Sequence, residues 1–423
     1  MEINNIYGVF RLLNSISKLA GLSLFSETCA EGNRLKKKLN IMVLYSVLLT
    51  LFIVLVAIYV MYWIVTEENQ DIIDIHLLQM PIIVTTSAII LLVSNLKFIS
   101  GMNLMLQRVS LIDELLKISD DNYIKNSKLI KKQILIVMII YGMFSIWEIF
   151  MFKRSNSSLA YCGAMSMPVV IHFITALQYI NFVYLIRERF KLINRCILSP
   201  RITCVNSMRL LYSDLGIIQS IQTDKCLILS SELYTYSLKH LKGGVRNSEV
   251  IPSSFENTNK LKLHFQTLRI IQEGMCEVSS LINDMYCFQI LLFILTSFTD
   301  VTANLYYSIE RLTSSSSKDV TSTLRIMLPI TWAIFYFMFV FVISWICELA
   351  SNEGRRTAIV LQKLLLIPNL QPQIVSEIKL FSYQVLIRKV SFTAWNIFTL
   401  NLKFLGSIVG SIITLLVILV QYF

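Results

Sequence analysis

The sequence predicts an all-α polytopic membrane protein with seven transmembrane helices, a cytoplasmic N-terminus and an external C-terminus. The first observation is composition, because 55% of the 423 residues are hydrophobic and only 15% are charged, which is far more apolar than a soluble protein. The second is that the chain contains apolar stretches near the length of about 20 residues that a helix needs to cross a bilayer. The third is an alternation of basic-rich and basic-poor segments between those stretches.

The apolar stretches define the predicted spans in chain order. Proline stands near the start of the second, fourth and sixth stretch, as Pro81, Pro168 and Pro329. Proline is tolerated in the first turn of a helix because its missing N–H would have had no partner there. We therefore predict helix starts at these points, and the spans at 41–65, 76–96, 133–152, 165–186, 285–308, 326–347 and 404–423.

Charge between the spans predicts their orientation. Residues 1–40 contain six Lys and Arg, whereas 66–75 contain none, and the alternation continues along the chain. Loops rich in Lys and Arg remain on the cytoplasmic side, which sets the predicted sidedness. The basic-rich segments are 1–40, 97–132, 187–284 and 348–395, and the basic-poor ones are 66–75, 153–164 and 309–325.

One segment on the predicted external side contains a glycosylation signal. Asn156 begins Asn-Ser-Ser, the only Asn-x-Ser/Thr acceptor in the chain. We therefore predict a glycan on Asn156.

The predicted cytoplasmic segments contain further helices. Residues 1–40 begin with apolar positions spaced for an amphipathic helix at the membrane interface. Residues 187–284 show helical periodicity on both sides of 242–260, whose glycines, proline and serines predict a flexible linker. Residues 348–403 are predicted to be helical, with breaks at Pro368 and Pro372.

Several function classes lack their sequence signals. The chain has no phosphate-binding loop, no Cys-x-x-Cys, no His-Glu-x-x-His and no Gly-x-Ser-x-Gly, so we predict neither an enzyme nor a cofactor. Its four histidines are dispersed, so no metal site is predicted. The net charge of +11 follows membrane sidedness, so no nucleic-acid partner is predicted.

The last span carries its polar residues on one face. Four of them stand at i, i+4, i+7 and i+14, and an isoleucine fills the gap at i+11. Such a stripe fits either a water-filled pore or polar packing against another helix. An adjacent face carries Gly406 and Gly410, which would allow a second helix to approach closely. The stripe comprises Ser407, Ser411, Thr414, Ile418 and Gln421.

The same span resembles the C-terminal signature of insect gustatory receptors. That signature is written TYhhhhhQF with h apolar, and residues 414–422 read TLLVILVQY, with Leu415 in place of Tyr and Tyr422 in place of Phe. The resemblance extends upstream to FTA at 392–394 and FTLN at 398–401, and to ELASNEGRRTAIVLQKL at 348–364.

The resemblance implies a ligand-gated, non-selective cation channel of the plasma membrane. It implies four subunits, as a homotetramer or a heteromer with related receptors, around one pore lined by the last span. It also implies a small tastant as ligand, either a sugar such as fructose or a bitter plant compound. In the sugar-receptor branch of the family an acidic residue commonly stands where this chain has the apolar Leu416, which counts against that branch. An odorant receptor of the same superfamily and a secondary transporter remain alternatives.

Polar and aromatic residues at comparable depth in four spans suggest the ligand pocket. Each taken alone also fits an interfacial or packing role. As a group they suggest a cavity open to the outside, where an ionisable group such as Asp300 would face water or a partner. The candidate ligand-binding residues are Trp147, Glu148, His172, Thr175, Tyr179, Asp300, Thr331, Trp332 and Tyr336.

Overall fold

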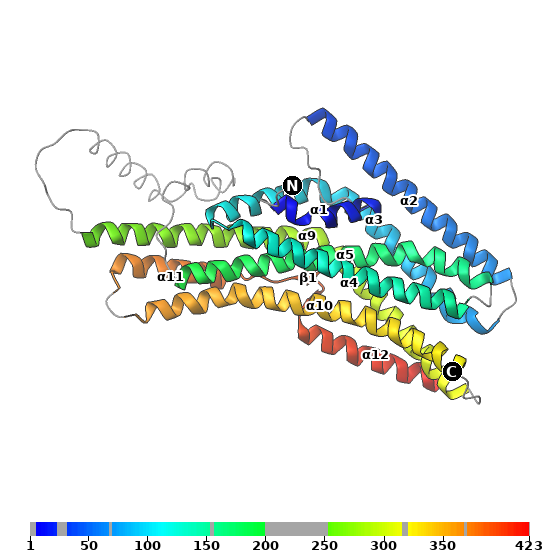
Figure 1. The fold of residues 1–423 in the computed structure, drawn as a ribbon. Helices are drawn as coiled ribbons and strands as arrows, with labels where there is room; N and C mark the ends of the chain where they lie inside the picture. The colour runs from blue at the N-terminus through cyan, green and yellow to red at the C-terminus, as the bar shows by residue number, and fades with distance from the viewer. Residues whose placement is uncertain are drawn as a thin grey trace, which may run out of the picture.

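The computed structural model is an all-α bundle whose long helices run side by side (Figure 1). It describes residues 6–22, 32–66, 70–152, 156–198, 253–314, 320–367 and 370–422. The helices are α1 (Ile6–Leu19), α2 (Gly32–Thr66), α3 (Gln70–Leu115), α4 (Asp120–Phe152), α5 (Asn156–Leu198), α9 (Ser253–Ser314), α10 (Val320–Leu365), α11 (Pro372–Ile387) and α12 (Leu402–Tyr422), and the strands are β1 (Thr393–Ala394) and β2 (Phe398–Thr399).

Every predicted span falls within a separate helix, apart from Phe423, which lies outside the described residues. Among the described residues, five helices contain segments long and apolar enough to cross a membrane. Two further helices, α2 and α3, contain the shorter apolar stretches Val43–Tyr59 and Gln79–Ser94. The five longer segments are Asp120–Trp147, Ser166–Leu198, Asn259–Thr313, Ile326–Leu365 and Leu402–Gln421. The orientation of these helices across the membrane, and the glycan on Asn156, stay predictions.

The predicted amphipathic helix is α1, but protein covers its apolar face. Phe10 and Leu13 are each 1% exposed, and the Phe10 ring stacks on Phe182 of α5 with ring centroids 4.7 Å apart. Gln178 of α5 donates a hydrogen bond from Nε2 to the Ser17 hydroxyl over 2.7 Å. The apolar face of α1 was predicted to lie in the membrane interface, and this was wrong. The face packs on the helix bundle instead, because the bundle offers it both apolar packing and a polar contact.

The helices α3, α5, α9 and α10 continue well beyond the predicted spans. Pro81, Pro168 and Pro329 lie inside α3, α5 and α10, so the predicted helix starts at these prolines were wrong. Helix α9 has 62 residues, which corresponds to roughly 90 Å at the helical rise. The predicted linker lies outside the described residues up to 252, whereas 253–260 already belong to α9.

A short hairpin interrupts the region 348–403, which was predicted to be helical with breaks only at Pro368 and Pro372. Strands β1 and β2 pair antiparallel, with Thr393 opposite Thr399. The turn between them contains Trp395 at φ 48° and Asn396 at φ 58°. Two successive residues with positive φ make the tight turn that suits a hairpin, and Asn tolerates this conformation whereas Trp rarely adopts it. The chain is thus reversed just before α12.

A buried ion pair joins three helices beyond the ends of the spans predicted from the sequence. The Arg189 guanidinium of α5 donates two hydrogen bonds to the Asp113 carboxylate of α3, over 2.7 Å and 2.8 Å, and both side chains are 1% exposed. The Tyr123 hydroxyl of α4 donates a third over 2.9 Å. Burial raises the pKa of the Asp113 carboxyl, while the Arg189 guanidinium acts to lower it. Removing one partner of such a pair costs about 3–5 kcal/mol, so the triad holds α3, α4 and α5 in register.

Candidate functional site

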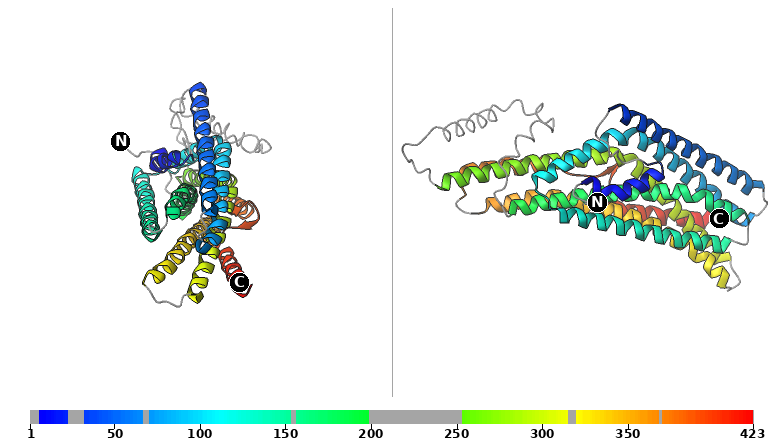
Figure 2. Two further views of the ribbon diagram at one scale, coloured as in Figure 1. Left: turned by 90° about the vertical axis from the view of Figure 1, so that its right-hand side faces the viewer. Right: turned by 45° about the horizontal axis from the view of Figure 1, so that its top comes forward.

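Helix α12 lies at the edge of the bundle, alongside α9 and α10 (Figure 2). Its first turn is held by side-chain acceptors. The backbone N–H of Leu402 donates to Oε2 of Glu348 on α10 over 2.8 Å, and the N–H of Phe404 donates to Oδ1 of Asn401 over 2.9 Å. The first amides of a helix have no partner within it, and a carboxylate there is favoured by the helix dipole. Glu348 therefore fixes the start of α12 to α10.

The hairpin fixes the same point to α9. Asn283 of α9 accepts a hydrogen bond from the Thr393 N–H over 2.7 Å and donates one to its hydroxyl over 3.2 Å. The Phe398 ring stacks on Phe404 of α12 with centroids 4.0 Å apart. The base of α12 is thus tied to both long helices.

Beyond this base, half of α12 is uncovered. The residues that pack toward the bundle include Ile408, Ile412 and Leu416. On the opposite side, a Cβ added at Gly406 or Gly410 would meet no atom within 4 Å. All five predicted pore residues, Ser407, Ser411, Thr414, Ile418 and Gln421, are exposed on this side of the helix.

The exposed half contains two adjacent stripes. One is the polar stripe of the predicted pore residues, and the other carries Gly406, Gly410 and Val417. The hydroxyls of Ser411 and Thr414 donate to backbone carbonyls one turn earlier, at Ser407 and Gly410. Such back-bonding satisfies each hydroxyl proton without a partner helix. The oxygen lone pairs remain available at the helix surface.

Among the predicted pocket residues, the structure joins Asp300 with Tyr336 and Trp332. Asp300 of α9 is 2% exposed, and its carboxylate accepts a hydrogen bond from the Tyr336 hydroxyl of α10. Its Oδ2 atom has no hydrogen-bond partner among the described residues. The Trp332 ring lies 6.0 Å from the Tyr336 ring. A carboxylate of α9 therefore contacts a phenol of α10, and that phenol lies beside an indole of the same helix.

An aromatic cluster that the sequence analysis missed surrounds Trp332. The Trp332 ring packs on the rings of Phe144 of α4 and of Phe335, with ring centroids 5.1 Å and 6.0 Å apart. Phe173 of α5 lies 4.8 Å from Phe335 and 5.3 Å from Tyr336. Apolar residues at such positions look the same in sequence whether they face lipid or protein, so no local signal distinguished them.

His172 belongs to a neighbouring polar network. Its Nε2 atom lies 3.1 Å from the Thr86 hydroxyl of α3, and Thr296 of α9 donates to that hydroxyl over 3.0 Å. The other ring nitrogen has no hydrogen-bond partner among the described residues. The His172 and Phe293 rings lie 6.3 Å apart.

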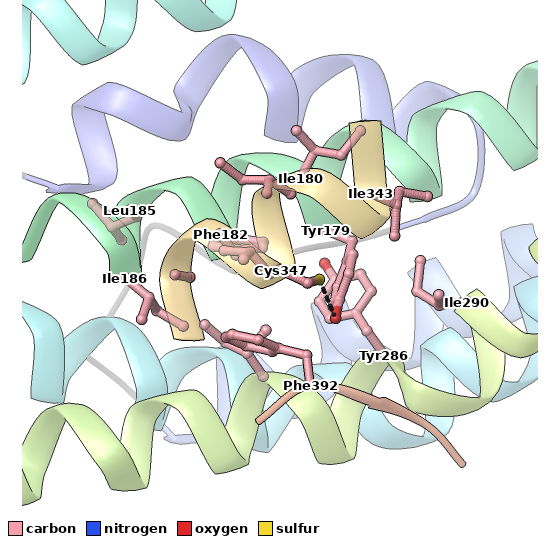
Figure 3. Packing of buried hydrophobic residues seen from close by; sticks show 14 of the residues in the cluster. Tyr179, Ile180, Phe182, Leu185, Ile186, Tyr286, Ile290, Ile343, Cys347 and Phe392 are labelled. Atoms are coloured by element: carbon pink, nitrogen blue, oxygen red, sulfur yellow. Dashed lines mark hydrogen bonds between the residues drawn. The ribbon is translucent and has the colours of Figure 1, made fainter. Parts of the chain in front are cut away.

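The remaining candidates make other contacts. Tyr179 packs with Tyr286 near the hairpin, and its hydroxyl lies 3.4 Å from the Cys347 sulfur (Figure 3). Thr175 and Thr331 donate to carbonyls of their own helices. Trp147 is partly buried, and the side chain of Glu148 lies outside the described residues. No hydrogen bond joins Tyr179, Thr175, Thr331 or Trp147 to Asp300 in the described part of the chain.

A scan against protein families matches the 7tm chemosensory receptor family over residues 10–422. The chain belongs to this family. Membership of this receptor family agrees with the prediction that the chain is not an enzyme. No curated protein sequence matches this chemosensory receptor significantly.

Solved structures show the same fold. The receptor is similar to the insect olfactory receptor OR5 from Machilis hrabei, with a TM-score of 0.62, 13% identity and 98% of each chain covered. It is also similar to that protein in complex with eugenol, with a TM-score of 0.60 at the same identity and coverage. At this identity the likeness shows the fold alone. It confirms the predicted seven-helix chemoreceptor fold.

The contact between Glu348 and the start of α12 predicts a change in hydrogen exchange. Glu348→Ala removes the acceptor of the Leu402 amide, and losing such a cap costs about 1 kcal/mol, or about fivefold in opening of the first turn. Hydrogen–deuterium exchange of peptides covering residues 400–410 should therefore speed up by about that factor. Asn352→Ala, at an exposed position one turn further along α10, is the control. Equal exchange in both variants would show that Glu348 does not hold α12.

Proposed function

We propose that this chemosensory receptor is a gustatory receptor that acts as a ligand-gated, non-selective cation channel in the plasma membrane. The observation that carries the proposal is the outward polar stripe of α12. Unpaired polar groups facing lipid are costly. A stripe of hydroxyl and amide groups on the open side of a membrane helix is therefore best satisfied by water in a pore shared between copies of the chain.

The two adjacent exposed stripes of α12 fit a ring of subunits. In a closed ring each subunit contacts its neighbours through two different surfaces. A helix beside the symmetry axis then needs one face toward the axis and another toward the next subunit. The polar stripe fits the first role, and the face with Gly406 and Gly410 fits close approach of a neighbouring helix. Similarity to gustatory receptors suggests four subunits, either identical or with related receptors.

Helix α11 offers a second uncovered surface for assembly. Its exposed side carries Leu380, Tyr383, Leu386 and Ile387, which are 47%, 65%, 49% and 61% exposed. Outside the membrane such a large apolar patch is unusual for a monomer and is typical of protein interfaces. The α11 surface therefore supports contact between subunits at the end of the bundle predicted to be cytoplasmic.

Ile418 and Gln421 would form the narrowest part of the pore. They stand at the C-terminal end of the polar stripe, and both are exposed. A ring of isoleucines can exclude water when the helices are close together, and a ring of amides can replace part of the hydration shell of an ion. Selection among different cations would then be weak, since no charged residue stands on this stripe.

The ligand site in this proposal is centred on Asp300, Tyr336 and Trp332. The unpartnered Oδ2 of Asp300 can accept a hydrogen bond from a hydroxyl or pair with a protonated amine. Aromatic faces around it can stack on a sugar or on an alkaloid. A small tastant, either a sugar such as fructose or a bitter plant compound, matches this chemistry.

An odorant receptor is the second candidate function. The observation that favours it is the structural similarity to an olfactory receptor, one structure of which contains eugenol. The interpretation as a gustatory receptor is supported by residues 414–422, which resemble the C-terminal signature of that family.

Whole-cell recording tests the proposed activity. Cells expressing this chain alone and exposed to sugars, bitter plant compounds and volatile odorants should show a cation current to at least one compound. A response confined to volatile odorants would favour the odorant receptor. Uptake of a compound without any current would indicate a transporter and contradict the channel.

The chemistry of Asp300 predicts how its replacement changes ligand sensitivity. For a neutral polyol, Asp300→Asn weakens one hydrogen bond and should cost about 1 kcal/mol, or about fivefold in the half-activating concentration. For a cationic compound the shift should exceed tenfold, because a buried charge loses its partner, a loss of about 3–5 kcal/mol. Dose–response curves decide between them. Asp284→Asn, an exposed carboxylate on the same helix, is the control and should show no shift. If Asp300→Asn matches this control for every active compound, Asp300 does not line the ligand site.

A further inference from the structure

Four lysines lie on the outer side of helix α4 near its start. Lys125, Lys128, Lys131 and Lys132 are all exposed. The buried side of the helix carries Tyr123, Ser127, Ile130 and Ile134, each at most 7% exposed. This spacing of i, i+4, i+7 and i+11 fixes which side of α4 faces the bundle. The lysines therefore point away from the protein.

An exposed apolar surface begins directly where the lysines end. Leu135 is 60% exposed and stands one turn after Lys131, and Ile136 is 44% exposed and stands one turn after Lys132. Met138 and Ile139, each 52% exposed, continue this surface along α4. In a membrane protein such a surface faces lipid tails. The lysines consequently lie at the level where lipid headgroups begin.

In the part of the chain that the structure describes, no ion pair involves any of the four lysines, so none neutralises the positive charge of this surface there. Asp120 and Asp121 stand at the start of α4, where the helix dipole stabilises acidic residues. They precede the lysines by one to three turns, so the side of the patch next to the apolar surface is purely basic.

We propose that Lys125, Lys128, Lys131 and Lys132 form a binding surface for the headgroup of an anionic phospholipid. The ammonium groups can pair with phosphate oxygens, while the alkyl chains of Lys131 and Lys132 lie along the lipid. The acyl chains would then pack on Leu135, Ile136 and Ile139. Clusters of lysine on the cytoplasmic side of a membrane helix favour polyanionic headgroups. This surface does not depend on the ligand site or on channel activity.

Binding to the purified full-length protein tests the surface. In an uncharged detergent, a short-chain phosphatidylinositol bisphosphate should bind at least about tenfold more tightly than a short-chain phosphatidylcholine, since each lysine contributes about fivefold near an anionic surface. Combined replacement of the four lysines by Gln should abolish that difference. The matched control replaces Arg355, Lys363, Lys379 and Lys389 by Gln, which removes the same charge at exposed positions of α10, α11 and the segment after it. The control should bind as the wild type does.

Two further measurements on the wild-type protein test the proposal even if the variant with four lysines replaced does not fold. Binding of the bisphosphate lipid to the wild type should weaken as salt is raised, because exposed charges are screened. Soluble inositol trisphosphate should bind more weakly than the lipid, because it has no acyl chains for the apolar surface. The proposal is overturned by salt-independent binding, by equal binding of the soluble headgroup, or by equal loss in the control variant.

Discussion

The structure depends on one constraint, which is that a polar face cannot remain uncovered within a membrane. Helix α12 is apolar where it meets α9 and α10, and it is polar along one of the two stripes that its own chain leaves open. Within a single copy, the Ser411 and Thr414 hydroxyls donate only to carbonyls of their own helix, and the oxygen lone pairs remain open at the helix surface. The proposed assembly around a water-filled axis resolves the mismatch, because the stripe then faces water while the glycine face meets a neighbouring helix.

The helices that hold α12 are the same ones that build the proposed ligand site. Helix α10 carries both Tyr336 and, about three turns later, Glu348, which accepts the first amide of α12. Helix α9 carries both Asp300 and Asn283, which holds the hairpin before α12. In the proposed channel, a ligand that shifts α9 against α10 would therefore also shift the two points to which α12 is attached. Long helices are suited to this role because they move as rigid elements.

Sequence periodicity predicted the spans and the outward stripe of α12, because both depend on residues close together in the chain. It did not predict the hairpin, whose turn places Trp395 at a positive φ that its residue type disfavours. It also missed the pairing of Asp113 with Arg189 and the aromatic cluster around Trp332. These contacts join distant helices, and nothing in the local pattern of either partner specifies the other.

The candidate ligand site was predicted only in part, and for a related reason. The sequence analysis grouped Tyr179 with Asp300 because both lie at a comparable depth in their predicted spans. The position of a residue along a span does not determine the direction in which its side chain points. The structure places Tyr179 against Cys347 and Tyr286, away from the contact between Asp300 and Tyr336.

Cysteine accessibility along α12 tests the central claim most directly. Cysteines replacing Ser407, Ser411, Thr414, Ile418 and Gln421 should react with water-soluble thiol reagents, change the current, and react at different rates with and without an activating compound. Cysteines at Ile412 and Leu416, on the packed side of the helix, should remain unreactive. Reaction at Ile412 and Leu416 with none at the five stripe positions would show that this face of α12 does not line the pore.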